Sequence, residues 1–290
     1  MIKVARFVAT CAISLALATF SIATAQTITT IDYPGATATT LNGGPNPQGT
    51  SVGTYTDTAG VTRGFTLTSA GIFTAFDPPG STATTPNFIS PQGTIIGGYV
   101  DGSGVSHGFI LSGGQYRNVD FPGAAGTVLT SLNPLGELTG FSCTVASCAT
   151  GPFQSFTLSK FGAFNGFNPP GSNNSQATVV NPNGEVVGAF EDSAGSVHGY
   201  ILYQGTFTTN DFPGATLTFD GGSNATGEIV GEYIDTAGVA HSFLLNGGTY
   251  TGFDPPGATL SDATGINPGG VIVGLYADSA GVLHGYIRTP

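Results

Sequence analysis

The chain has 290 residues, only 8% of them charged, and a formal net charge of −11. Two of its six basic residues, Lys3 and Arg6, fall in a predicted leader, so the mature chain has four basic residues against 17 acids, a net charge of −13. So few cations cannot neutralise phosphates, which disfavours nucleic acids and anionic membranes as partners.

Residues 1–25 have the order of a secretory signal peptide. A positively charged start precedes an apolar run at 7–22, and small residues at 23–25 offer a cleavage site before Gln26. We therefore expect export to the periplasm or the outside of the cell. An alternative, a lipoprotein anchored through Cys11, is disfavoured because the apolar run before it is short. No later apolar stretch reaches the ~20 residues of a membrane-spanning helix.

An Asp-x-Pro-Gly phrase, with Asn for Asp in one copy, then recurs six times at intervals of 43 to 48 residues. The copies begin at Asp32, Asp77, Asp120, Asn168, Asp211 and Asp254. A period of this length is the signature of a repeat architecture. Pro fixes φ and Gly accepts positive φ, so each phrase predicts a tight turn that its Asp caps.

Each repeat contains four short predicted strands. A Thr-rich first strand ends at a turn residue, and the second strand, as at 230–235, places Gly between a β-branched residue and an aromatic. Gly within a strand predicts that another part of the chain packs closely there, and we expect the neighbouring repeat. The third strand reads His-Gly-Phe-x-Leu at His107–Leu111, and 250–253 is typical of the fourth. The turn residues are Asn46, Ser90, Asn133, Asn181, Asn224 and Asn267.

The two ends of the chain complement each other. The last repeat, from Asp254 to Pro290, lacks a fourth strand, and Gln26–Ile31 supplies one. Closing the ring removes exposed sheet edges, whereas a linear array would need capping repeats. Strands of about six residues are also short for crossing a bilayer. We predict an all-β chain in which residues 26–290 form one six-bladed β-propeller of four-stranded blades, closed by the N-terminal strand.

Several phrases resemble the bacterial secreted HAF-type extracellular repeat family, which is named for its His-Ala-Phe motif. They are His-Gly-Phe-Ile-Leu ending at Leu111, Ile-Asn-Pro-Gly around Asn267, and the recurrent Val-Gly-x-Tyr-x-Asp. Gly or Ser stands here where that family often has Ala. The resemblance covers essentially all of 27–290 and implies export and a propeller-like array. It implies no catalytic residue.

Histidine occupies one position in four repeats, always six residues after an aspartate. Across a hairpin this spacing places the two side chains opposite each other, as a metal or acid–base pair or as a structural pair. Arg63 takes the histidine's place opposite Asp57, and Arg cannot ligate a metal. We therefore favour the structural role and expect no metal or cofactor. The histidine pairs are Asp101–His107, Asp192–His198, Asp235–His241 and Asp278–His284.

Calcium and catalysis are the remaining chemical possibilities. The acidic turns should gather on one face of the ring, but calcium needs 6–8 converging oxygens and one Asp per turn is sparse. No Gly-x-Ser-x-Gly, phosphate-binding loop or His-Glu-x-x-His motif is present in the sequence. Asp220 and Asp262 are the acids on first strands that would face a central channel, where a glycosidase needs two converging carboxylates.

The third repeat departs most from the pattern. Cys143 and Cys148 lie in a longer hairpin that runs through Gly151-Pro152, and an oxidising compartment favours a disulfide between them. Two readings stay open: a stapled insertion, or a rigid loop that overhangs a ligand site.

Three functions remain. The first is a secreted, monomeric, non-catalytic propeller that binds an extracellular glycan or protein through one face. The second is a hydrolase or lyase of extracellular polysaccharide with an acid pair near the channel, and the third is a structural cell-surface protein. Channel-facing side chains discriminate them: acids converging beside an aromatic favour the enzyme, whereas a Thr and Ser lining favours binding or scaffolding.

Overall fold

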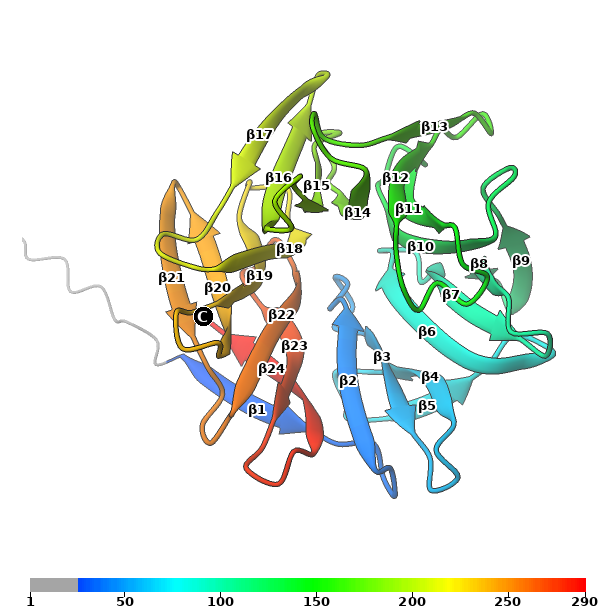
Figure 1. The fold of residues 1–290 in the computed structure, drawn as a ribbon. Coiled ribbons are helices and arrows are strands. Elements are labelled where there is room, and N and C mark those ends of the chain that lie inside the picture. The colour runs from blue at the N-terminus through cyan, green and yellow to red at the C-terminus, as the bar shows by residue number, and fades with distance from the viewer. Residues whose placement is uncertain (1–25) are drawn as a thin grey trace, which may run out of the picture.

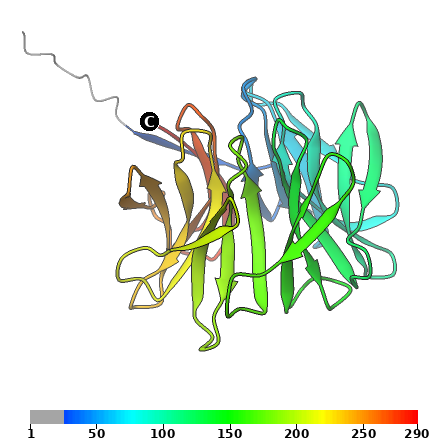
Figure 2. The same cartoon turned by 90° about the horizontal axis from the view of Figure 1, so that it is seen from above.

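The computed structural model describes residues 26–290, which form 24 strands in six four-stranded antiparallel sheets. The sheets stand as blades in a ring around a common axis (Figure 1), and their strands run roughly along that axis (Figure 2). The predicted six-bladed propeller is therefore confirmed. The predicted signal peptide lies outside the described residues. Within 26–290 no helix has the length and hydrophobicity needed to span a membrane.

The blades follow one another in chain order. Blade 1 contains β2 (Ala38–Gly43), β3 (Ser51–Thr56), β4 (Thr62–Leu67) and β5 (Phe73–Phe76). Blade 2 contains β6 (Ser81–Ile89), β7 (Ile95–Asp101), β8 (Ser106–Ser112) and β9 (Gln115–Val119). Blade 3 contains β10 (Gly126–Leu132), β11 (Leu138–Cys143), β12 (Phe153–Leu158) and β13 (Phe164–Phe167). Blade 4 contains β14 (Asn174–Val180), β15 (Val186–Glu191), β16 (Val197–Tyr203) and β17 (Thr206–Asn210). Blade 5 contains β18 (Leu217–Ser223), β19 (Ile229–Ile234), β20 (Ala240–Asn246) and β21 (Thr249–Phe253).

Blade 6 joins the two ends of the chain. It contains β22 (Leu260–Ile266), β23 (Ile272–Ala277), β24 (Leu283–Thr289) and the N-terminal β1 (Thr27–Ile31). β1 pairs antiparallel with β24, from Thr27 opposite Thr289 to Ile31 opposite Gly285. The N-terminal strand closes the ring as the sequence predicts, so no blade is left with only three strands.

The core lies between the faces of neighbouring blades. The third strand of each blade places one aromatic ring at the same position, and all six rings are fully buried. Burying such a ring stabilises the fold by roughly 1.5–3 kcal/mol relative to leaving it exposed. These rings are Phe65, Phe109, Phe156, Tyr200, Phe243 and Tyr286.

The glycine in each second strand has a different neighbour from the one predicted. A Cβ atom on Gly231 would collide with the carbonyl of Phe219 and the ring of Phe243, both in the same blade. Each first strand carries a β-bulge at this level, such as the register shift between Asp220 and Gly222. A bulge bends the strand, and here the carbonyl two residues before the bulge residue lies over the glycine. The close approach is thus made within the blade, and the prediction of a neighbouring blade is wrong.

The residue at the bulge also joins neighbouring blades around the channel. In five blades its side chain donates a hydrogen bond to the carbonyl that precedes the bulge of the next blade, and we call this bond the channel latch. The latches are Asn42 to Pro86 (3.1 Å), Asn87 to Leu129 (2.8 Å), Thr130 to Ala177 (2.8 Å), Thr178 to Asp220 (2.8 Å) and Thr264 to Leu41 (2.7 Å). In blade 5 the bulge residue is Gly221, which has no side chain to donate.

Candidate binding site in the central channel

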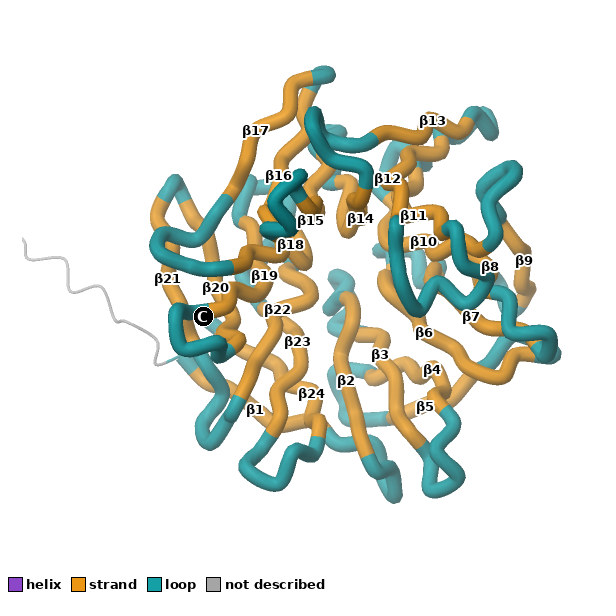
Figure 3. Tube along the Cα trace, viewed as in Figure 1, coloured by secondary structure: helices purple, strands orange, loops and turns teal. Residues whose placement is uncertain are grey.

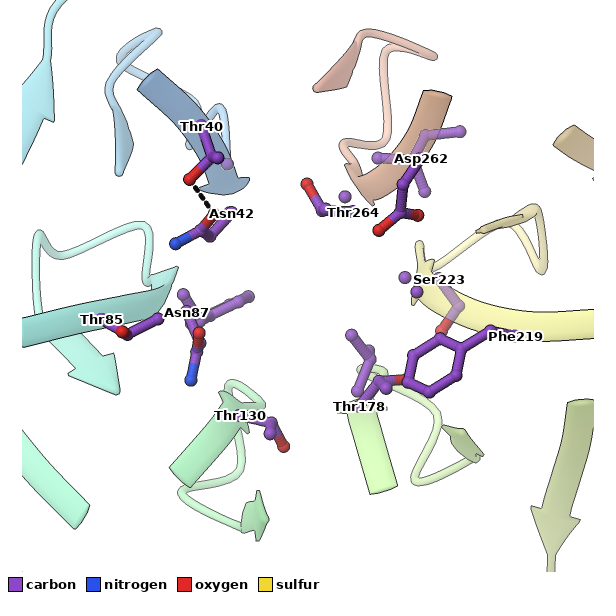
Figure 4. Close-up of a pocket in the computed structure, with 18 of the residues that line it drawn as sticks. Thr40, Asn42, Thr85, Asn87, Thr130, Thr178, Phe219, Ser223, Asp262 and Thr264 are labelled. Carbon is purple, nitrogen blue, oxygen red and sulfur yellow. Dashed lines mark hydrogen bonds between the residues drawn. The ribbon is translucent and has the colours of Figure 1, made fainter. Parts of the chain in front are cut away.

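The channel contains a cavity of about 320 Å³ whose wall comes from the first strands of all six blades. Figure 4 shows these side chains around a common open centre. A second cavity of about 360 Å³ shares part of this wall. The residues common to both are Thr85, Asn87, Thr130, Thr178 and Phe219. The two cavities therefore form one channel region, of a size typical of small-molecule sites.

The wall differs where blade 5 meets blade 6. Gly221 and Gly222 line the cavity there, and a Cβ on Gly221 would lie 2.5 Å from the carbonyl oxygen of Ala263. The joint is thus closed at the channel by backbone contact in place of a side-chain latch. Phe219 and Ser223 flank the glycines, and the Ser223 hydroxyl is buried without a hydrogen-bond partner among the described residues.

Asp262 is the acidic side chain on this wall. Its side chain projects into the channel in Figure 4, and its Oδ1 atom is buried with no hydrogen-bond partner in the described part of the chain. Burial, and then the negative charge of Glu232 on β19, raise the pKa of Asp262 to about 8. Burial also raises the pKa of Glu232. Of the residues described around the cavity, Asp262 is the one with an ionisable side chain.

Asp220 does not share the channel with Asp262. It is fully buried between blades 4 and 5, where the Nδ2 amide of Asn210 donates to both carboxylate oxygens at 2.9 and 2.8 Å. The hydroxyl of Tyr250 donates to Asn210 at 2.7 Å, and burial raises the pKa of Asp220 well above its usual range. Asp220 lies one register position beyond Asp262, so strand alternation turns it to the other face. The expectation of two channel-facing aspartates is wrong for Asp220.

The long hairpin of blade 3 covers one side of the channel. Cys143 and Cys148 form a disulfide, and the loop between them crosses in front of blades 2 and 3 (Figure 3). Ser106 of blade 2 holds it, donating from its backbone amide to Ala146 at 2.7 Å and from its hydroxyl to Ser147 at 2.9 Å. Ser147 and Cys148 line the 360 Å³ cavity. This placement favours the reading of an overhanging loop.

The repeated histidines lie between two carboxylates on the turn face. In blade 5, Nδ1 of His241 lies 2.8 Å from Asp254 and its Nε2 lies 3.4 Å from Asp235. Partial burial alone would lower the pKa of His241, but the hydrogen bonds and charges of Asp254 and then Asp235 outweigh it, so the pKa is raised. The other three histidines have the same arrangement: His107 lies between Asp120 and Asp101, His198 between Asp211 and Asp192, and His284 between Asp32 and Asp278.

The hairpin aspartates have a second role in their own turns. Oδ1 of Asp235 accepts from the backbone amides of Ala237 and Val239, at 2.8 and 2.9 Å. These backbone bonds, and then the bond to His241, lower the pKa of Asp235. In blade 1, Arg63 bridges Asp57 at 3.0 Å and Asp77 at 2.9 Å. No group of three or more potential metal ligands occurs within 26–290.

The chain is a six-bladed β-propeller with a polar channel, and comparisons with known proteins extend this class no further than the fold. A scan against protein-family models and a search of curated proteins both find no match. Similarity to the HAF-type repeat family therefore remains a prediction from the sequence.

Several solved structures have the same fold at low sequence identity. A catalytically inactive virginiamycin B lyase from Staphylococcus aureus is 10% identical, over 91% of this chain and 99% of that one, with a TM-score of 0.52. A six-bladed, fucose-recognising lectin from Aleuria aurantia is also 10% identical, over 87% and 93%, at 0.53. A putative TolB from Agrobacterium tumefaciens is 15% identical, over 87% and 88%, at 0.55. One fold thus serves a lyase, a lectin and a TolB.

Sequence reasoning missed most of the channel wall. Phe219 and Asp262 lie at the same register position of blades 5 and 6, where blades 1 and 2 have Thr40 and Thr85. Asp262 was predicted to face the channel, and aligning the first strands of the repeats would also have revealed Phe219. The bulge that turns Ser223 toward the cavity has no comparable signal in the sequence.

Proposed function

We propose that the chain is exported and that its mature propeller is a non-catalytic module that binds an extracellular glycan in the central channel. The observation that carries this proposal is a channel wall on which most polar groups are hydroxyls and amides, with the ring of Phe219 beside them. Sugars present hydroxyls to hydrogen-bonding groups and C–H faces to aromatic rings, so such a wall suits them.

Unused hydrogen-bonding capacity supports the same function. Thr85 and Gln176 make no side-chain hydrogen bond within the described residues, and both line the 360 Å³ cavity. The latch residues, by contrast, each donate a hydrogen bond to the next blade. Thr85 is exposed and Gln176 is half-buried, so their polar groups are open to the channel and can exchange water for a ligand.

A glycan array probed with the purified mature protein tests this function. We expect binding to a limited set of glycans and loss of that binding in Phe219→Ala. The absence of any bound glycan would contradict the glycan proposal and favour a protein ligand or a structural role. A thermal-shift titration with calcium, run beside it, should leave Tm unchanged, because the acidic turns serve their own hairpins.

One observation favours a second function, hydrolysis or elimination in a polysaccharide. Burial raises the pKa of both Asp262 and Glu232, the charge of Glu232 raises that of Asp262 further, and Phe219 pairs with Glu232 across the sheet. Acid pairs of this kind serve as general acid and base in glycosidases. Glu232 lines a separate cavity of about 180 Å³ beside blade 4, however, so the channel itself presents only Asp262.

One assay distinguishes glycan binding from glycan cleavage. The mature protein is incubated with every glycan that binds, and the products are separated by chromatography. The binding function predicts intact glycan after long incubation. Cleavage that disappears in Asp262→Asn would establish the enzyme instead.

A further inference from the structure

We propose that Asp262 and the wall around it form a subsite for an ammonium group, so that the glycan bound in the channel carries at least one free amino group. The inference rests on the proposed function and names the chemistry of its ligand. Three features of the joint between blades 5 and 6 carry it: acids without a basic partner, unpaired polar atoms, and an aromatic face.

The two acids at this joint, Asp262 and Glu232, have no basic partner on the walls of these cavities. The charge of Glu232 disfavours ionisation of Asp262, yet no Lys, Arg or His lines the three described cavities to which Phe219 contributes. Carboxylates removed from water are strongly stabilised by an added cation, and a hydrogen-bonded ammonium supplies one. A uronate or sulfate at this place would instead meet like charge.

Two unpaired oxygen atoms belong to side chains of this wall, and a change of rotamer would let them receive N–H donors of an ammonium group. Five buried side-chain polar atoms in the described chain have no hydrogen-bond partner, and two of them, Oδ1 of Asp262 and Oγ of Ser223, belong to the same cavity. Ser223 is only 9% exposed, so its hydroxyl has little access to bulk water. An ammonium group has three donors and no acceptor, which matches a carboxylate and a hydroxyl.

Phe219 provides the third feature. Its ring lies on the channel wall next to Ser223, with Asp262 on the adjacent blade (Figure 4). An aromatic face attracts cations and also packs against the C–H face of a sugar ring.

The test is isothermal titration calorimetry of the mature protein at an ionic strength of about 0.15 M, where long-range attraction is screened. The ligands are oligomers of glucosamine, N-acetylglucosamine and glucose of equal length. We expect glucosamine oligomers to bind at least about tenfold more tightly than the other two, the factor that one hydrogen bond to a charged group supplies. Asp262→Asn should abolish this preference.

Two variants make the result specific. Glu137→Gln removes one negative charge outside the channel and keeps an acceptor for the Nδ2 amide of Asn133, so it should leave the affinity unchanged. Ser223→Ala should weaken glucosamine binding severalfold without changing net charge. It keeps the proposal testable if Asp262→Asn does not fold.

The outcomes separate the two proposals. Equal binding of all three oligomers, unaffected by Asp262→Asn, would overturn the ammonium subsite and leave glycan binding standing. Equal loss in Asp262→Asn and Glu137→Gln would show attraction to the acidic surface and also overturn the subsite. If none of these oligomers and no glycan on the array binds, the proposed function itself fails.

Discussion

Five joints between neighbouring blades are closed at the channel by a hydrogen-bonding side chain, whereas the joint between blades 5 and 6 is closed by glycine. At the latched joints, such as Thr130 to Ala177, the polar side chain is committed to the next blade. At the sixth, Gly221 packs directly against Ala263, and the neighbouring Ser223 and Asp262 keep unpaired polar atoms. The same bulge thus joins neighbouring blades through a side chain in five places, and at the sixth joint the nearby wall keeps unpaired polar atoms.

The largest contrast should appear with pH. The pKa of Asp262 is raised from 3.8 to about 8, so Asp262 favours the fold at low pH and this contribution is lost as pH rises from about 4 through 8. Asp262→Asn should therefore be relatively more stable than the wild type at pH 8 than at pH 5. Urea denaturation at both pH values measures this difference. A constant difference would show that the pKa of Asp262 is not raised.

Breaking the glycine joint should have the next largest effect. In Gly221→Ala the new Cβ meets the Ala263 carbonyl at 2.5 Å, so the blades must move apart. Overpacking of this kind costs about 1–3 kcal/mol, and a backbone obstacle places it at the upper end. Gly102→Ala, where nothing lies within 4 Å, is the matched control and should change little. Equal stability of the two variants would mean that the joint is not closely packed.

Breaking a latch should cost less. Thr130→Val keeps the shape of the side chain but leaves the carbonyl of Ala177 without its donor, at a cost of about 1–2 kcal/mol. Thr85→Val makes the same exchange on the channel wall, where the hydroxyl has no protein partner, and should be close to neutral. Chemical denaturation of both variants measures the pair. The latch would lose its energetic role if the two changed stability equally.

The smallest effect is expected on the outer turn face. His241 and its two aspartates are partly exposed, and exposed ion pairs contribute at most about 1 kcal/mol. Because the pKa of His241 is raised above 6.5, this contribution is present below about pH 6.5 and is lost as pH rises through the folded value. His241→Gln should thus lower Tm slightly at pH 5.5 and less at pH 8.5. A larger loss at pH 8.5 would contradict the pairing.

The sequence predicted the fold well because its signals are periodic. Six turns at near-constant intervals specify six blades, and the lone strand at Gln26–Ile31 specifies the closure. The channel was predicted poorly because its wall depends on bulges, which shift the register by one residue. Asp220 and Asp262 read alike in the sequence, yet one lies in the core and the other on the channel wall.

The most direct test of the account is the crystal structure of the mature protein with the tightest-binding glycan from the array. We predict a sugar in the channel, with one face against Phe219 and an amino group between Asp262 and Ser223. A sugar bound only on the outer strands of the blades, with the channel unoccupied by ligand, would contradict it.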